Sequence, residues 1–160
     1  MTYRQIIALL IAGLLVGGSA SARGKKIDRS ELPAAVEQAL QLHSPGATIK
    51  RLSLENNHGQ IFYEAKMKVN GHSKEVLINP SGEVLMVKEQ VPVSSLPPEV
   101  KAGLKAKAGF LGPVGRIDKV ETITRDGQLE GYEARVDTPV PFVTGMSSAS
   151  HIVRVDPHGN

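Results

Sequence analysis

The chain has 160 residues and a formal net charge of +3, which is enough for one domain or two small ones. Mixed charges, three Phe, three Tyr and no Trp exclude a basic, base-stacking surface, so we expect no nucleic-acid partner. The absence of cysteine excludes thiol chemistry, iron–sulfur clusters and disulfides, so an apolar core must stabilise the fold.

The first 22 residues have the pattern of a secretory signal peptide. A positive charge at Arg4 precedes an apolar run from Ile6 to Val16, and Ala20-Ser21-Ala22 is a small-x-small cleavage site. The apolar run is too short to span a bilayer comfortably. We therefore predict cleavage after Ala22, a periplasmic or secreted location, and no stable membrane insertion of the mature chain.

A flexible leader is predicted at 23–29, followed by a helix from Ser30 to about His43. The helix prediction rests on an apolar stripe at helical spacing with Pro33 in the first turn, where its missing N–H is harmless. The stripe consists of Leu32, Val36, Ala39 and Leu40. A strand is predicted next, from Ile49 to Glu55.

The stretch from Gly59 to Lys88 predicts three strands joined by tight turns. Apolar residues alternate with charged ones from Ile61 to Val69, which is the period of a strand with one buried face. Asn70-Gly71 is a strong signal for a two-residue hairpin, because both residues tolerate positive φ. The strands 76–78 and 84–87 are separated by the turn Asn79-Pro80-Ser81-Gly82.

The second half of the chain repeats this pattern. After a linker at 90–95, a helix is predicted from Pro97 to Ala108, weakened by Gly103 where the first helix has Ala39. Strands are predicted at 117–124 and 128–138, and a further strand leads into Asp156-Pro157-His158-Gly159. The repeated positions are Leu32/Leu96, Pro33/Pro97, Val36/Val100, Leu40/Leu104, Tyr63/Tyr132, Glu64/Glu133, Ala65/Ala134, Asn79/Asp156, Pro80/Pro157 and Gly82/Gly159.

The sequence thus predicts an α+β fold of two tandem repeats, each a helix packed on a 3–4-stranded antiparallel meander. The first repeat covers 30–89 and the second covers 96–160. The second has no equivalent of the strand 84–87, so we expect an open sheet edge there, or one filled by a partner.

The segment from Pro139 to Ser150 replaces the short Asn70-Gly71 turn. Its apolar side chains either fold over the core or form a contact loop, since loops on rigid scaffolds commonly carry recognition. The candidate partner-binding residues are Val140, Phe142, Val143 and Met146.

No catalytic pattern is present in the sequence. The five histidines have no metal-ligand spacing, and no nucleophile elbow, S-x-x-K motif or phosphate loop occurs. The acidic residues mostly alternate with Lys and Arg, as they do on solvated strand faces. We therefore predict a protein that is not an enzyme and holds no cofactor or metal.

The ordered motifs resemble those of the PepSY-like family of exported bacterial proteins, which are related in fold to the repeats of the β-lactamase inhibitor protein. The residues that carry the resemblance are Leu32, Pro33, Val36, Leu40, Tyr63, Glu64, Ala65, Ile78, Asn79, Pro80, Gly82 and Glu83, with their counterparts in the second half. The resemblance implies a helix on an antiparallel sheet in each repeat, an envelope location, and regulation of peptidases or sensing of ligands. Unlike the inhibitor's repeats, this chain has no cysteine, so no inhibitory residue is transferred.

Two functions follow as hypotheses. The first is an exported, non-catalytic binding module. In one version it regulates or inhibits an envelope peptidase or another envelope protein. It would bind a protein or peptide through a sheet face, the 139–150 loop or the open edge. The alternative is an envelope sensor of a small molecule or metal, with a cleft between the repeats.

Overall fold

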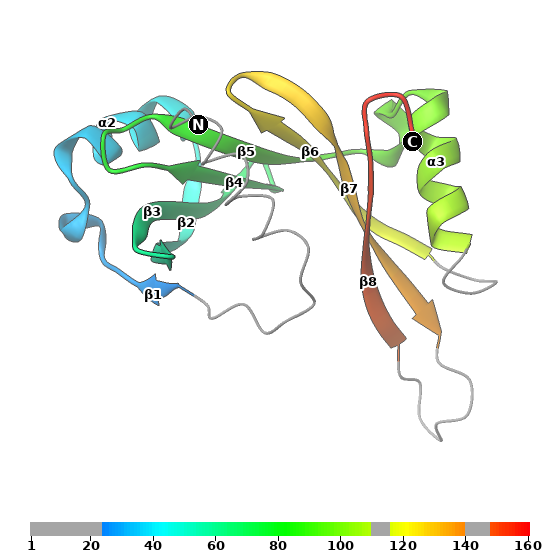
Figure 1. Cartoon of the computed structure of the whole chain (residues 1–160), viewed down its shortest axis with the longest axis horizontal. Coiled ribbons are helices and arrows are strands. Elements are labelled where there is room, and N and C mark those ends of the chain that lie inside the picture. Colours follow the sequence, from blue (N-terminus) through cyan, green and yellow to red (C-terminus); the bar gives the residue numbers. More distant parts are fainter. Residues whose placement is uncertain (1–23, 110–115, 140–147) are drawn as a thin grey trace.

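The computed structural model describes residues 24–109, 116–139 and 148–160. They form one eight-stranded antiparallel sheet in which the strands follow sequence order, with two α-helices packed on it (Figure 1). The elements are β1 (Lys25–Lys26), η1 (Arg29–Glu31), α2 (Ala34–His43), β2 (Thr48–Asn57), β3 (Gln60–Val69), β4 (His72–Ile78), β5 (Val84–Val91), η2 (Val93–Ser95), α3 (Pro98–Gly109), β6 (Arg116–Arg125), β7 (Gln128–Pro139) and β8 (Ser148–Val155).

The two-residue turn predicted at Asn70-Gly71 is confirmed, and two other strand connections are equally short. Residues His58-Gly59, Asn70-Gly71 and Asp126-Gly127 connect successive strands, and both residues of each pair have positive φ. Such turns twist the chain in the same sense as the strands they join. They fix the registers of three of the hairpins, and therefore which side chains share a face.

The predicted flexible leader is wrong for residues 25–27. Lys25 and Lys26 pair with β2, and the N–H of Ile27 donates a hydrogen bond to the carbonyl of Leu52. Ile27 is only 6% exposed and belongs to the core around α2. A single apolar residue among basic ones forms no periodic pattern, so the sequence does not indicate this contact.

The first helix also begins later than predicted. Residues Arg29–Glu31 form a 3-10 turn, and α2 starts at Ala34 after Pro33. Asp28 and Glu31 form a capping box around that turn, with the Asp28 N–H donating to Glu31 over 2.6 Å. The predicted linker is likewise shorter, because β5 extends to Val91.

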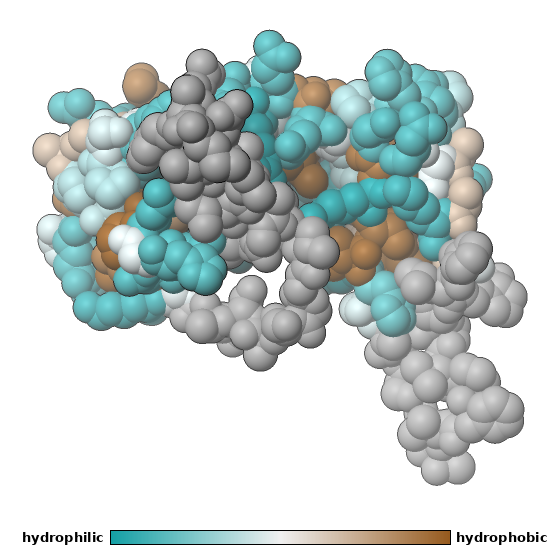
Figure 2. All heavy atoms as spheres, in the orientation of Figure 1, coloured by the Kyte–Doolittle hydropathy of each residue, from teal (hydrophilic) through white to brown (hydrophobic). Residues whose placement is uncertain are grey.

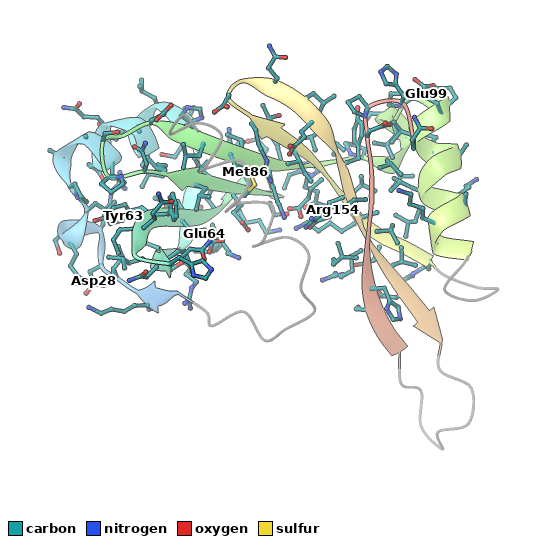
Figure 3. All side chains as sticks on the ribbon, viewed as in Figure 1. Asp28, Tyr63, Glu64, Met86, Glu99 and Arg154 are labelled. Carbon is teal, nitrogen blue, oxygen red and sulfur yellow. The ribbon has the colours of Figure 1, made fainter. Side chains whose placement is uncertain are left out.

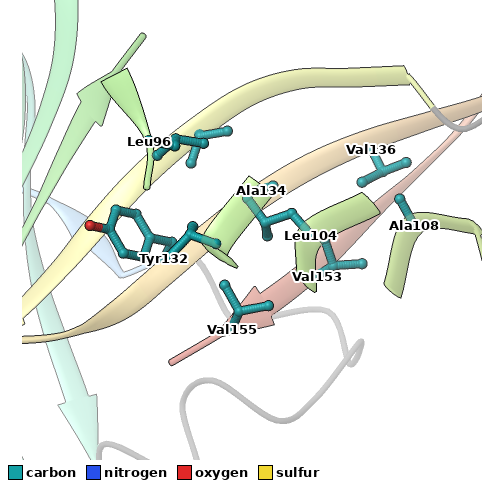
Figure 4. Close-up of a cluster of buried hydrophobic side chains, with 10 residues drawn as sticks. Leu96, Leu104, Ala108, Tyr132, Ala134, Val136, Val153 and Val155 are labelled. Atoms are coloured by element: carbon teal, nitrogen blue, oxygen red, sulfur yellow. The ribbon is translucent and has the colours of Figure 1, made fainter. Parts of the chain in front are cut away.

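Both helices cover the same face of the sheet. Apolar side chains of β2–β5 pack with α2, and those of β6–β8 pack with α3 (Figure 4). Val87 and Val91 lie on one face of β5 because they are four residues apart, and they contact the α2 and α3 clusters respectively. The two cores are therefore neighbours on one surface of the sheet.

The two halves join edge to edge through β5 and β6. Six residue pairs connect these strands, from Met86 opposite Arg125 to Val91 opposite Val120. A 3-10 turn and a helix separate these strands in the sequence, so no hairpin turn indicates that they pair. The sheet is consequently continuous from β1 to β8.

Gly103 permits a close contact between α3 and the turn after β8. A Cβ atom at Gly103 would lie 1.9 Å from the carbonyl oxygen of Gly159. Gly159 has φ +86, and a Cβ there would lie 2.2 Å from the Glu99 carbonyl. Gly103 is unfavourable for helix formation, but the close packing of α3 on this turn requires glycine there.

We predict that Gly103→Ala destabilises the protein by roughly 1–3 kcal/mol, as overpacking does, although alanine is the better helix former by about 1 kcal/mol. Gly109→Ala is the matched control, because a Cβ there meets nothing within 4 Å. Urea unfolding of both variants measures the difference. Equal or greater stability of Gly103→Ala would contradict the close contact.

Candidate functional site

The sheet face opposite the two helices carries most of the polar side chains of the strands. Side chains alternate along each strand, so Leu77 lies opposite in direction to Val76 and Ile78, and Glu133 opposite to Tyr132 and Ala134. We call this surface the helix-free face, since no helix of the described residues packs on it. In the orientation of Figure 1, hydrophilic residues with apolar ones between them make up the surface of the described residues that is in view (Figure 2).

A line of hydrogen-bonded and alternately charged groups crosses this face from β2 to β8. Figure 3 places Met86 between Glu64 near one end of this line and Arg154 near the other. We call the line the charged stripe; its members are Ser53, Glu64, Lys66, Glu75, Lys88, Glu133 and Arg154.

The first part of the charged stripe lies on β2, β3 and β4. The Ser53 hydroxyl donates to Glu64 over 3.2 Å. The Lys66 Nζ lies 3.4 Å from Glu64 and 3.2 Å from Glu75, so one cation bridges two carboxylates. Glu75 is paired across the strands with Lys88 on β5. This cross-strand pair connects the first part of the stripe to the second.

The second part of the charged stripe spans the junction between the halves. The Lys88 Nζ donates to both carboxylate oxygens of Glu133 at 3.1 Å. Arg154 reaches the same carboxylate at 2.6 Å from Nη2 and 2.7 Å from Nε. Both Lys88 and Glu133 are buried, at 9% and 8% exposure. Glu133 is therefore held by one cation from each half of the chain.

A backbone irregularity lies beside this ion pair. The register of β6 and β7 shifts between Ile123 and Thr124, next to Gly131. A Cβ at Gly131 would lie 2.3 Å from the carbonyl oxygen of Val155, so only glycine fits. Such bulges locally redirect a strand. We infer that Gly131 lets β8 approach β7 closely where Arg154 meets Glu133.

An apolar cluster adjoins the charged stripe. Leu77 and Met86 are cross-strand neighbours, and Ile123 is the neighbour of Lys88 on β6. Each member of the cluster is at most 6% exposed; the members are Phe62, Leu77, Leu85, Met86 and Ile123. The helix-free face thus has its own small core at the junction.

A second polar group lies on β4, β5 and β6. Gln90 accepts hydrogen bonds from the N–H and hydroxyl of Ser73, both at 3.0 Å. The Ser73 hydroxyl also lies 3.3 Å from Glu121, which pairs with Lys119 at 2.5 Å. These groups extend the fixed polar surface across the junction of the halves.

Two carboxylates of the stripe, Glu75 and Glu133, have opposite pKa shifts. Burial raises the pKa of Glu75, and the nearby charge of Glu64 raises it further against the opposing effect of Lys66 and Lys88. Burial also acts to raise the pKa of Glu133, but Lys88 and Arg154 outweigh it and the pKa is lowered. Glu133 therefore stays ionised to lower pH than an ordinary glutamate, whereas Glu75 takes up a proton more readily.

The sequence-predicted site residues Val140, Phe142, Val143 and Met146 lie outside the described residues, so their role stays a prediction. The predicted signal peptide, residues 1–22, lies outside them as well. No helix in the described part of the chain is long and apolar enough to cross a membrane. Across 24–109, 116–139 and 148–160, no group of three or more His, Asp or Glu side chains is placed to hold a metal ion.

The interpretation of strand acids as solvated is wrong for Glu133, which is buried in the ion pair with Lys88. The signal that could have found it is the repeated Tyr-Glu-Ala motif. Glu64 and Glu133 occupy the same place in that motif, and both accept a lysine on the helix-free face. Which lysine contacts each glutamate depends on how the strands pair, and the motif does not indicate that pairing.

No family model matches this chain, and no curated protein does. Solved structures of similar fold exist. A DUF2874 family protein from Bacteroides uniformis aligns at 18% identity over 80% of this chain and 84% of its own, with a TM-score of 0.54. A BLIP-like protein from Bacteroides fragilis aligns at 17% identity over 81% and 82%, with a TM-score of 0.53.

A third similar structure, from Bacteroides eggerthii, is described among "putative periplasmic proteins" and aligns at 18% identity over 80% of this chain and 84% of its own, with a TM-score of 0.55. At these identities the likeness concerns the fold. The chain therefore has an α+β fold like that of the β-lactamase inhibitor protein (BLIP-like), whereas the resemblance to PepSY-like proteins stays a prediction.

We predict that Glu133→Gln destabilises the protein by about 3 kcal/mol, because it removes the charge that compensates the buried Lys88. Glu37→Gln on α2 is the control. Its carboxylate pairs with the exposed Arg29, and such surface pairs contribute less than about 1 kcal/mol. Denaturant unfolding at neutral pH compares the two. Similar small losses would show that the buried pair does not hold the junction.

We also predict that Glu75→Gln raises the melting temperature at pH 7.5. The folded-state pKa of Glu75 is raised, so the protein loses stability as pH rises from the unfolded pKa of about 4.3 to that raised value, and the cost is absent at lower pH. The gain should therefore shrink toward pH 4. Glu121→Gln, which removes a carboxylate paired with Lys119, is the control and should give no gain. A Glu75→Gln variant that is less stable at pH 7.5 would contradict this.

Proposed function

We propose that this chain is an exported, non-catalytic binding module whose helix-free face binds a protein of the cell envelope. The observation that carries the proposal is the continuous helix-free face, which crosses both halves with a fixed pattern of charges. A sheet covered by helices on one side presents the other side as a rigid surface. Rigid surfaces lose little conformational entropy on binding, which favours recognition.

The chemistry of the charged stripe around Glu133 supports binding over catalysis. Its carboxylates each lie beside a lysine or arginine, and Glu133 is held ionised by two cations. A general acid near neutral pH needs a proton to donate, which a carboxyl with a lowered pKa does not hold. The stripe is suited instead to charge complementarity, which governs partner choice and association rate.

We also infer that the two halves are tandem copies, each a helix on a meander. Two corresponding turns support this. The Asn79 side chain accepts the N–H groups of Ser81 and Glu83, and the Asp156 side chain accepts those of His158 and Asn160. The location in the envelope rests on the pattern of residues 1–22 and on the similarity to a protein described as periplasmic. Inhibition of a peptidase is one version of the proposed binding.

The alternative function is an envelope sensor of a small molecule or metal. The arrangement of the halves favours the protein partner, because β5 and β6 pair directly where that hypothesis places a cleft. A thermal-shift screen of metabolites and divalent cations separates the two, since a ligand of the native state raises its melting temperature.

The binding proposal predicts that charge reversal on the helix-free face abolishes capture of an envelope protein. Lys68→Glu with Arg135→Glu reverses two exposed cations, one in each half. Lys101→Glu with Lys105→Glu makes the same charge change on α3 and is the matched control. The full chain and the α3 variant should retain one specific protein from the native envelope fraction, identified by mass spectrometry.

Calorimetry with the purified partner then measures the affinity, which should fall at least about tenfold for the Lys68/Arg135 variant. Circular dichroism of both variants checks that the fold is unchanged. Equal loss in the two variants would place the contact elsewhere, and the absence of any retained protein would contradict the proposal.

A further inference from the structure

The strand β8 has one neighbour, β7, among the described residues, whereas β4, its counterpart in the first half, has two. The turns that follow β4 and β8 have the same hydrogen bonds. The N–H of Asn79 donates to the carbonyl of Glu83, and that of Asp156 to the carbonyl of Asn160, both at 3.0 Å. Gly82 and Gly159 have φ of +87 and +86. The outer edge of β8 therefore has the local geometry that β5 occupies beside β4.

The side chains of β8 differ from those of β4 in one informative place. Counted back from the matching turns, Ile152 corresponds to Glu75, which faces Lys88 on β5. Ile152 is 56% exposed, one of the few large apolar side chains of the described residues that reach solvent. Natural sheets usually protect an edge with charge. Here the edge strand has the apolar residue and the interior strand has the charge.

The backbone of β8 also points groups away from β7. The Arg154 carbonyl accepts a hydrogen bond from Lys107 of α3 at 2.7 Å. Backbone groups alternate in direction along an antiparallel strand. We infer that the N–H and C=O of Ile152, two residues away, point to the same outer side. Lys107 is exposed, so its hydrogen bond is readily exchanged for one from a peptide N–H.

We propose that the outer edge of β8 binds an extended segment of another polypeptide, antiparallel to β8, with an apolar residue facing Ile152. The bound segment would occupy the place that β5 takes in the first half, and Lys107 would yield the Arg154 carbonyl to it. This is β-augmentation, in which main-chain hydrogen bonds supply affinity and side chains supply specificity. The inference rests on the proposed binding function but uses the outer backbone edge of β8, which lies away from Lys68 on β3, whereas Arg135 is the cross-strand neighbour of Ile152.

The strand β5 supplies a concrete probe, because it is the strand that this edge geometry accepts within the chain. The probe is a fluorescent peptide of residues 82–91 with Lys88→Val, so that valine faces Ile152, and with two lysines added for solubility. Fluorescence anisotropy measures its binding to the full chain. The control peptide carries Met86→Pro as well, which removes the N–H that would donate to the Arg154 carbonyl.

The proposal predicts saturable binding of the probe and none of the control peptide. Ile152→Asp should weaken binding at least about tenfold, and Ile152→Pro should do the same by removing the outward N–H. Lys107→Ala should tighten binding, whereas Lys105→Ala, the matched change on the same helix, should not. Circular dichroism identifies any variant that fails to fold. If Ile152→Pro fails to fold, the test rests on Ile152→Asp.

Three results would overturn this proposal. They are no saturable binding by either the full chain or Lys107→Ala, binding that is unaffected by the Ile152 substitutions, and a dimer in light scattering that Ile152→Asp abolishes without any binding of the probe. The last would assign the edge to a second copy of the chain. The single variant Lys68→Glu, changed on β3 and not on β7 or β8, should bind the probe normally, so failure of the edge and failure of the proposed sheet-face contact can be told apart.

Discussion

The pairing of β5 with β6 is the constraint on which the rest of the structure depends. It joins strands β1–β5 and β6–β8 into one continuous sheet, and it brings Lys88 within reach of Glu133. Burying these two charges is tolerated because they pair with each other, and Glu133 also accepts a hydrogen bond from Arg154. Since Arg154 binds the same carboxylate from β8, the ion pair connects β5, β7 and β8 on one face. We infer that the pair specifies how the halves join as well as stabilising the join.

The two faces of the sheet differ in role: one stabilises the fold, and the other is the proposed binding surface. On the helical face, apolar side chains at every second position pack against α2 and α3, and this burial is the main source of stability. The helix-free face carries ionic groups that contribute less to stability, yet their positions are fixed by the strands. A chain without cysteine must derive its stability from the first face. The second is then available for recognition, which is the basis of the proposed function.

The parts of the fold that local chemistry determines could be predicted from the sequence. Asn70-Gly71 and Asp126-Gly127 specify tight turns because their residues tolerate positive φ, and the alternation from Ile61 to Val69 specifies a strand. The extension of pairing to Lys25 and Lys26, and the burial of Ile27, could not be predicted because they depend on a distant strand. The packing role of Gly103 could not be predicted for the same reason, since glycine is required there by the close approach of Gly159.

The central claim is that the helix-free face contacts an envelope protein, and site-specific photocrosslinking in the native host tests it most directly. Benzoylphenylalanine would replace Lys68 on β3 in one strain and Lys105 on α3 in another, both exposed positions. The account predicts one discrete crosslinked protein from position 68 and none from position 105. A crosslink from position 105 alone, or none from either position with both proteins folded, would contradict it.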